Sequence, residues 1–129
     1  MINNPRNFIF LKSKILQLPK DYDYRKSQLA ELIKQEADAG TVSTEIDKKV
    51  DESISNLKSV GWQRKHILYF LHDMLNNSPD LYSTFDTLLL EIDSGLTGNC
   101  DLDYVDRFPG DPIDKKDFAF FVRTFKWLE

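Results

Sequence analysis

Apolar side chains recur every three or four residues along most of this chain, which is the spacing of amphipathic helices. The clearest run lies between Val42 and Gly61, where Lys, Asp and Glu fill the intervening positions. Gly61 is placed to end this helix. Its predicted buried stripe consists of Val42, Ile46, Val50, Ile54 and Leu57.

The same spacing predicts a helix on each side of this one. The first extends from about Tyr22 to Ala37, where good helix formers dominate, and its apolar face carries Leu29, Leu32 and Ile33. The second extends from Gln63 to Asn76, with Ile67, Phe70, Leu71 and Met74 on one face.

Glycine and proline divide the C-terminal half into shorter elements. Ser78 and Pro79 predict a helix start, and Gly95 predicts its end. The apolar stripe of that helix is Leu81, Phe85, Leu88, Leu89 and Ile92. Residues 95 to 113 are then expected to form a structured loop with one helical turn within Leu102 to Arg107.

The final helix is predicted to begin at Asp114, whose carboxylate can cap free backbone N–H groups. Its apolar face is expected to carry Phe118, Phe121, Val122 and Phe125. Trp127 and Leu128 follow it, and a tail this apolar should dock on the core.

The first segment, Phe8 to Leu18, is ambiguous because its continuous apolar start could open a strand or a helix. The spacing of Leu11, Ile15 and Leu18 favours a helix. Alternating patterns with hairpin turns are missing from the sequence, so a sheet has little support. We therefore expect an all-α fold: residues 1 to 129 form a single domain, a bundle of five to six helices with a structured acidic loop before the C-terminal helix.

Negative charge is concentrated in one part of the chain, whose formal net charge is −4. Between Asp86 and Asp114 there are eight acidic side chains and a single basic one, Arg107. Such a surface attracts basic partners and repels nucleic acid, over distances that shorten with salt. Basic residues near the N-terminus alternate with aromatic ones, but a pI of about 5.2 argues against nucleic-acid binding.

The sequence also predicts the compartment. Cys100 is the single cysteine and cannot form an intramolecular disulfide, and the N-terminus does not resemble a secretory signal. The apolar windows are much shorter than the roughly 20 residues that span a bilayer. We expect a cytoplasmic protein with no membrane segment.

The sequence offers few groups for catalysis or metal binding. Asp101, Asp103 and Asp106 form D-x-D-x-x-D, but this pattern fails the order of a calcium loop. His66 and His72 are six residues apart, on roughly opposite helix faces. We expect no catalytic residue and no cofactor or metal. A metal-dependent hydrolase built on the three aspartates is a less favoured alternative.

Three stretches carry a resemblance to a known group of proteins. They are Glu91-Ile92-Asp93-Ser94-Gly95-Leu96-Thr97-Gly98-Asn99-Cys100, then Arg107-Phe108-Pro109-Gly110-Asp111-Pro112, then Phe121-Val122-Arg123. Roughly from residue 80 to 129, the chain resembles the small helical immunity proteins of bacterial contact-dependent growth inhibition and colicin-type toxin systems. The resemblance implies a non-enzymatic inhibitor that binds a cognate toxin C-terminal domain, in many such systems a nuclease with a basic cleft. A monomer in a one-to-one complex is expected.

The acidic segment supplies the expected partner contacts. The charged contacts are Glu91, Asp93, Asp101, Asp103, Asp106, Asp111 and Asp114. Tyr104 and Phe108 are candidate apolar anchors, because interface energy concentrates in a few aromatic residues. The alternative is that both rings only pin the loop to the core.

A second hypothesis is a helical adaptor or regulatory module that docks through the aromatic C-terminal helix, from Phe118 to Trp127. It differs from the first in its binding surface. Reversal of the acidic loop charges would leave an adaptor able to bind its partner.

Overall fold

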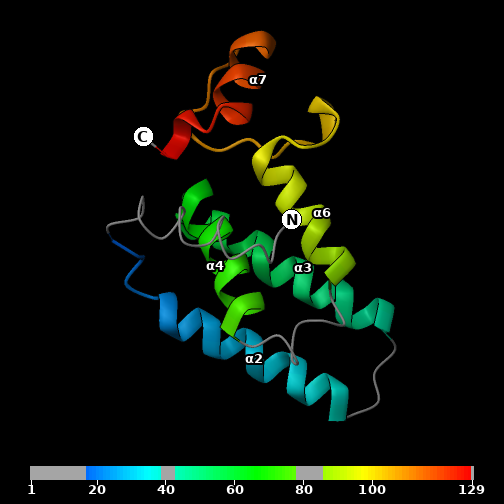
Figure 1. Cartoon of the computed structure of the whole chain (residues 1–129). Helices are drawn as coiled ribbons and strands as arrows, with labels where there is room; N and C mark the ends of the chain where they lie inside the picture. Colours follow the sequence, from blue (N-terminus) through cyan, green and yellow to red (C-terminus); the bar gives the residue numbers. More distant parts are fainter. Residues whose placement is uncertain (1–16, 39–42, 78–85, 129) are drawn as a thin grey trace.

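A computed structural model of the chain describes residues 17–38, 43–77 and 86–128 (Figure 1). Its α-helices are α2 (Tyr22–Asp38), α3 (Ser43–Ser59), α4 (Arg64–Asn77), α6 (Asp86–Thr97) and α7 (Lys115–Arg123). Two 3₁₀ turns, η2 (Leu102–Tyr104) and η3 (Lys126–Leu128), complete the described elements. These ranges contain no strand, and the prediction of an all-α fold is confirmed.

Some predictions fall outside the described residues. They concern residues 8–16, the helix start at Ser78 and Pro79, and the stripe positions Val42, Leu81 and Phe85.

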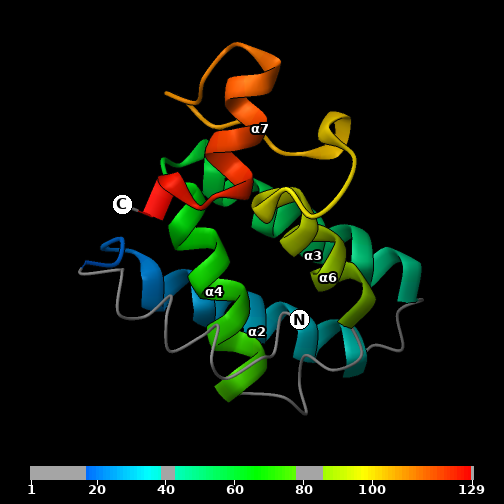
Figure 2. The same cartoon turned by 45° about the horizontal axis from the view of Figure 1, so that its top comes forward.

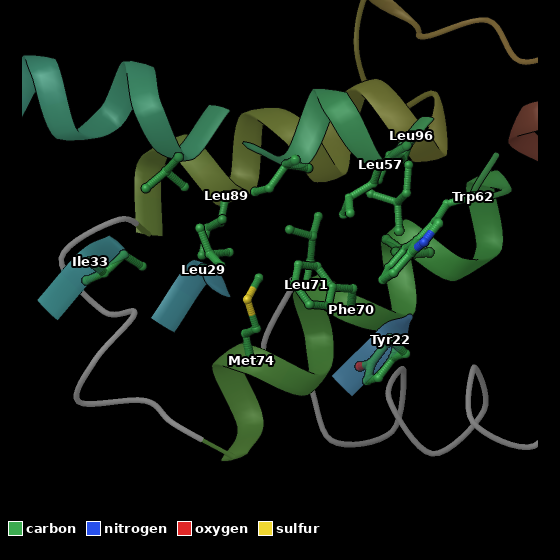
Figure 3. Close-up of a cluster of buried hydrophobic side chains, with 14 of the residues drawn as sticks. Tyr22, Leu29, Ile33, Leu57, Trp62, Phe70, Leu71, Met74, Leu89 and Leu96 are labelled. Carbon is green, nitrogen blue, oxygen red and sulfur yellow. The ribbon is translucent and has the colours of Figure 1, made fainter. Parts of the chain in front are cut away.

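Helix α4 is the central element of the bundle, since it contacts α3, α6 and η3. Leu71 and Met74 of α4 are completely buried, as is Leu89 of α6. Figure 3 shows these side chains converging with Leu29 and Leu57 from the neighbouring helices. The described stripe positions of α2, α3, α4 and α6 therefore form one hydrophobic core, and its burial is the main stabilising contribution to the fold.

Helix α2 is held against α4 by an aromatic and polar cluster. The ring of Tyr22 stacks on Trp62, with centroids 5.6 Å apart, and its hydroxyl donates to Asp73 at 2.5 Å. Lys26 donates to the same carboxylate at 2.9 Å. Burial and the Asp73 carboxylate raise the pKa of Tyr22, so the hydroxyl remains a donor.

Helix α6 continues to Thr97, so the predicted end at Gly95 is wrong. Gly98, with φ of 78°, is the left-handed residue that follows the helix. Gly95 has a different role, because a Cβ there would lie 3.4 Å from the Tyr104 carbonyl oxygen. Its own carbonyl accepts a hydrogen bond from the Asp106 N–H at 2.8 Å, so this glycine lets the loop pack closely on α6.

Helix α7 lies at the other end of the molecule from α2 in both views (Figures 1 and 2). Phe118 and Val122 form a second, smaller core with Val105, surrounded by partly buried Cys100, Leu102 and Phe121. The Asp114 cap is confirmed, since its carboxylate accepts from the N–H groups of Lys116 and Asp117 at 3.0 and 3.1 Å.

Three predictions concern the C-terminal end, and one of them is wrong. The helical turn of the loop is present but short, as η2. Phe125 does not belong to the buried stripe, because it follows the end of α7 with φ of 58° and is exposed. Leu128 is buried and Trp127 packs against the main core, so the tail is docked as expected.

None of the helices in the described ranges combines the length and the apolar character that crossing a bilayer requires.

Candidate functional site

An open hollow of about 340 Å³ lies between α3, α6 and the loop that contains η2. Four carboxylates and one basic side chain, Lys48, contribute to its lining. The carboxylates are Asp47, Asp51, Glu91 and Asp106. Leu88 and Ile92 add apolar surface, and Tyr104 completes the lining. We call this feature the acidic hollow.

The carboxylates of α3 lie in the hollow because the opposite face of that helix is buried. Ile46, Val50 and Ile54 point into the core, so Asp47 and Asp51 are left on the outer side, one turn apart. Like charges at this spacing repel one another by a few tenths of a kcal/mol. This repulsion remains in the free protein, and a positively charged partner would relieve it.

The loop brings the other wall of the hollow into place. Asp106 is held beside α6 by its N–H bond to Gly95, and Glu91 lies one turn earlier on the same helix. Tyr104 is 77% exposed, so its ring does not pin the loop to the core. A hollow with carboxylate walls and an exposed ring has the chemistry to receive basic side chains.

The loop is anchored by Arg64, the first residue of α4, which is only 3% exposed. Its guanidinium donates to the carbonyl oxygens of Leu96 at 2.7 Å and Asp106 at 2.5 Å. It also donates to the Asp111 carboxylate at 2.8 Å, and the same oxygen accepts from the Phe108 N–H at 2.8 Å. One cation thus joins the end of α6 to two points of the loop.

Two expected partner contacts are internal for this reason. The Asp111 side chain is 8% exposed and fully engaged with Arg64 and the Phe108 N–H, so the expectation that it faces a partner is wrong. Phe108 is partly buried against the main core, and its ring centroid lies 4.6 Å from the Arg64 guanidinium carbon. The alternative reading, that this ring pins the loop, fits Phe108.

The remaining predicted contacts lie outside the acidic hollow. Asp93 is mostly buried, with its carboxylate 3.5 Å from Nε2 of His72. Asp101 accepts from the Asp103 N–H at the start of η2, and Asp114 caps α7. The Asp103 side chain is 78% exposed and lies 3.8 Å from Lys115. The structure therefore brings together Glu91, Tyr104 and Asp106 from the predicted set.

Comparisons with protein-family models, curated proteins and solved structures find no match to this chain. The acidic hollow is interpreted from its own geometry. Within the described ranges, no three His, Cys, Asp or Glu side chains are grouped so that they could hold a metal ion.

The carboxyl group of Asp106 has a raised pKa. The largest cause is its desolvation, and Asp51 adds to it, while Lys58 and Arg64 act in the opposite direction. Ionisation of the Asp106 carboxyl group is therefore less favourable in the folded chain than in the unfolded chain, although the Asp106 backbone groups are hydrogen-bonded. Carboxyl groups with perturbed pKa values are common at functional sites.

The thiol of Cys100 is not prepared for nucleophilic chemistry. Its partial burial is the largest cause of a raised pKa, and Asp101 and Asp106 raise it further. Its Sγ lies 3.4 Å from the carbonyl oxygen of Ser94, to which the thiol donates. The thiol form is therefore favoured over the thiolate, and burial is the main reason.

The residues of the site and its anchor that were not predicted from the sequence include two carboxylates of α3 and one arginine. Asp47 and Asp51 carried a usable signal, because two acids one turn apart on the polar face of a clear helix form a negative patch. Arg64 carried none, since nothing in the sequence distinguishes it from the exposed Lys and Arg residues nearby.

Substitution of Asp111 by Asn should destabilise the fold strongly, because it leaves a buried guanidinium without its counter-charge. We expect a loss of roughly 3 kcal/mol in the free energy of unfolding, measured by urea denaturation. Asp103→Asn is the matched control in an exposed pair and should cost less than about 0.5 kcal/mol. Equal losses for the two variants would contradict the assigned role of Arg64.

Substitution of Asp106 by Asn should stabilise the fold at neutral pH. The folded-state pKa is raised above the ordinary 3.8, so the folded chain binds the proton more readily than the unfolded one. Wild-type stability from this group therefore grows as the pH falls through the raised pKa, and the advantage of Asn should vanish at about pH 4 or below. Thermal unfolding of both chains across this range checks the sign, and a less stable Asn variant at neutral pH would refute it.

Proposed function

We propose that this chain is a non-catalytic immunity protein that binds a cognate bacterial toxin domain, with the acidic hollow receiving basic side chains of that domain. The observation that carries the proposal is the gathering of four carboxylates around one lysine beside the exposed ring of Tyr104. The resemblance of residues 80 to 129 to immunity proteins supplies the class of partner.

The charge of the hollow suits a partner whose own site is basic. A nuclease must hold phosphates, so its cleft concentrates Lys and Arg side chains. An acidic domain docked in or beside that cleft excludes the substrate by occupying space and by neutralising the field. Opposite charges also raise the association rate, and this contribution falls with ionic strength.

Tyr104 is the best candidate for an apolar anchor. Its ring is exposed at the edge of the hollow, where an incoming arginine could stack on it while pairing with a carboxylate. Tyrosine is also among the residues that concentrate binding energy at interfaces. The nearby Asp103, fully outside the hollow, would extend the negative field toward the partner.

The anchoring of the loop supports tight binding. Because Arg64 and Gly95 fix the Asp106 backbone from two directions, the hollow does not have to be ordered when a partner arrives. Preorganisation of this kind lowers the entropic cost of association.

A helical adaptor is a second candidate, favoured by a specific observation on α7. Phe120 is 62% exposed, on the side of the helix away from the buried Phe118 and Val122, and Ile113, just before the N-cap of α7, is 93% exposed. Single exposed apolar residues are common on protein surfaces, so these two residues support the adaptor function less strongly than the hollow supports the immunity function. Its docking residues would be Ile113 and Phe120, because Phe118 is inside the small core.

Co-expression with the cognate toxic domain tests the proposal. We expect the wild type to protect cells and to co-purify with the toxin, and we expect Asp51→Lys with Glu91→Lys to lose both properties. Two charge reversals in contact with a basic partner should weaken binding by at least about 100-fold. Glu31→Lys with Glu52→Lys is the matched control, because both residues are exposed and neither lines the hollow.

The outcomes separate the candidates. If the control variant protects cells as the wild type does and the variant of the hollow does not, the result supports the acidic hollow as the interface. Equal protection by both variants would refute the hollow but keep the immunity role. If the wild type neither protects cells nor forms a complex, the immunity role fails, and loss of another partner by Phe120→Ser would favour the adaptor.

A further inference from the structure

A second hollow, of about 330 Å³, lies where the end of α3, the start of α4, the loop and the tail meet. Its lining includes Phe108 and Asp111 from the loop, Trp127 from η3 and Lys58 from α3. This volume is within the range of small-molecule sites. It is separate from the acidic hollow, with which it shares no lining residue.

Three aromatic side chains contribute to the walls of this hollow. It is lined by both tryptophans of the chain, Trp62 and Trp127, and by the ring of Phe108. The indole N–H groups are already bonded, that of Trp62 to Asp21 and that of Trp127 to the Val122 carbonyl oxygen. The indoles therefore offer a ligand no free donor, and the partly buried Trp127 presents more ring surface than Trp62, which is 4% exposed.

The polar part of the lining is positive, although the chain as a whole is negative. Lys58, Arg64 and Lys65 contribute three cations against the single carboxylate of Asp111. Neither lysine forms an ion pair with a residue in the described ranges. Nε of Arg64 is buried and has no hydrogen-bond partner there, so this corner holds more positive donors than acceptors.

We propose that this hollow is a binding site for a small anion carried on a flat aromatic body. The aromatic walls would take the ring, and Lys58 and Lys65 would pair with the oxyanion at the mouth. The shared chemistry is a planar ring with a negatively charged oxygen group, which either an aromatic carboxylate or a nucleotide phosphate supplies. The proposal does not depend on the immunity role.

Nuclear magnetic resonance can test this site directly, because the two indole N–H signals of the chain both come from its walls. The full chain is titrated at low salt with 2-naphthoate as the carboxylate probe and with adenosine 5′-monophosphate as the phosphate probe. A neutral naphthalene alcohol serves as the uncharged isostere. We expect saturable shifts of at least one indole signal with at least one anion, and at least about five-fold weaker binding of the alcohol.

The variant Lys58→Gln with Lys65→Gln should bind the anion about five-fold more weakly than the wild type. Lys20→Gln with Lys34→Gln is the control, because it makes the same change of net charge at exposed positions outside the hollow. Saturable binding of one probe and not the other identifies whether the site takes a carboxylate or a phosphate. The proposal is overturned if neither anion gives a saturable shift, if the alcohol binds equally well, or if the two double variants bind alike.

Discussion

A buried guanidinium is the constraint on which the C-terminal half of this structure depends. Arg64 is removed from water, and such a cation is tolerated only where hydrogen bonds and a counter-charge replace its hydration. The groups that do so come from the end of α6, from Asp106 and from Asp111. The loop between α6 and α7 contributes one buried apolar side chain, Val105, to the small core beneath α7, and this cation adds a second set of attachments that order the loop. Both hollows border the loop that it holds.

The helices were predictable because burial on one side imposes a period that the sequence shows directly. The stripes of α3 and α4 are buried as expected, and the cap at Asp114 follows from local geometry alone. The end of α6 was missed because glycine has two uses that a sequence does not distinguish. Gly95 lies against the loop, whereas Gly98 supplies the left-handed turn and also the closest approach, since a Cβ there would lie 2.9 Å from Cγ1 of Val122.

The negative charge of the candidate site was predictable from the sequence, but the shape of the site was not. Counting charges identified the acidic segment, yet Asp106 and Asp111 differ only in what they meet in the fold. Asp111 is internal because Arg64, 47 positions earlier, reaches it. Asp47 and Asp51 were not predicted because they lie outside the acidic segment of the sequence, whereas the hollow combines two helices and a loop. Side-chain partners distant in sequence set these assignments, and no local pattern encodes them.

The central claim is that Arg64 orders the loop between α6 and α7 more strongly than it orders the core around α4. Amide hydrogen exchange in Arg64→Met, with Lys65→Met as the neighbouring control, tests this most directly. The account predicts that the amides of Asp106 and Phe108 lose protection by roughly ten-fold more than those of Val50 and Leu71 in the core. It also predicts that the control leaves both regions unchanged. Equal loss across loop and core, or an unchanged loop, would contradict the account.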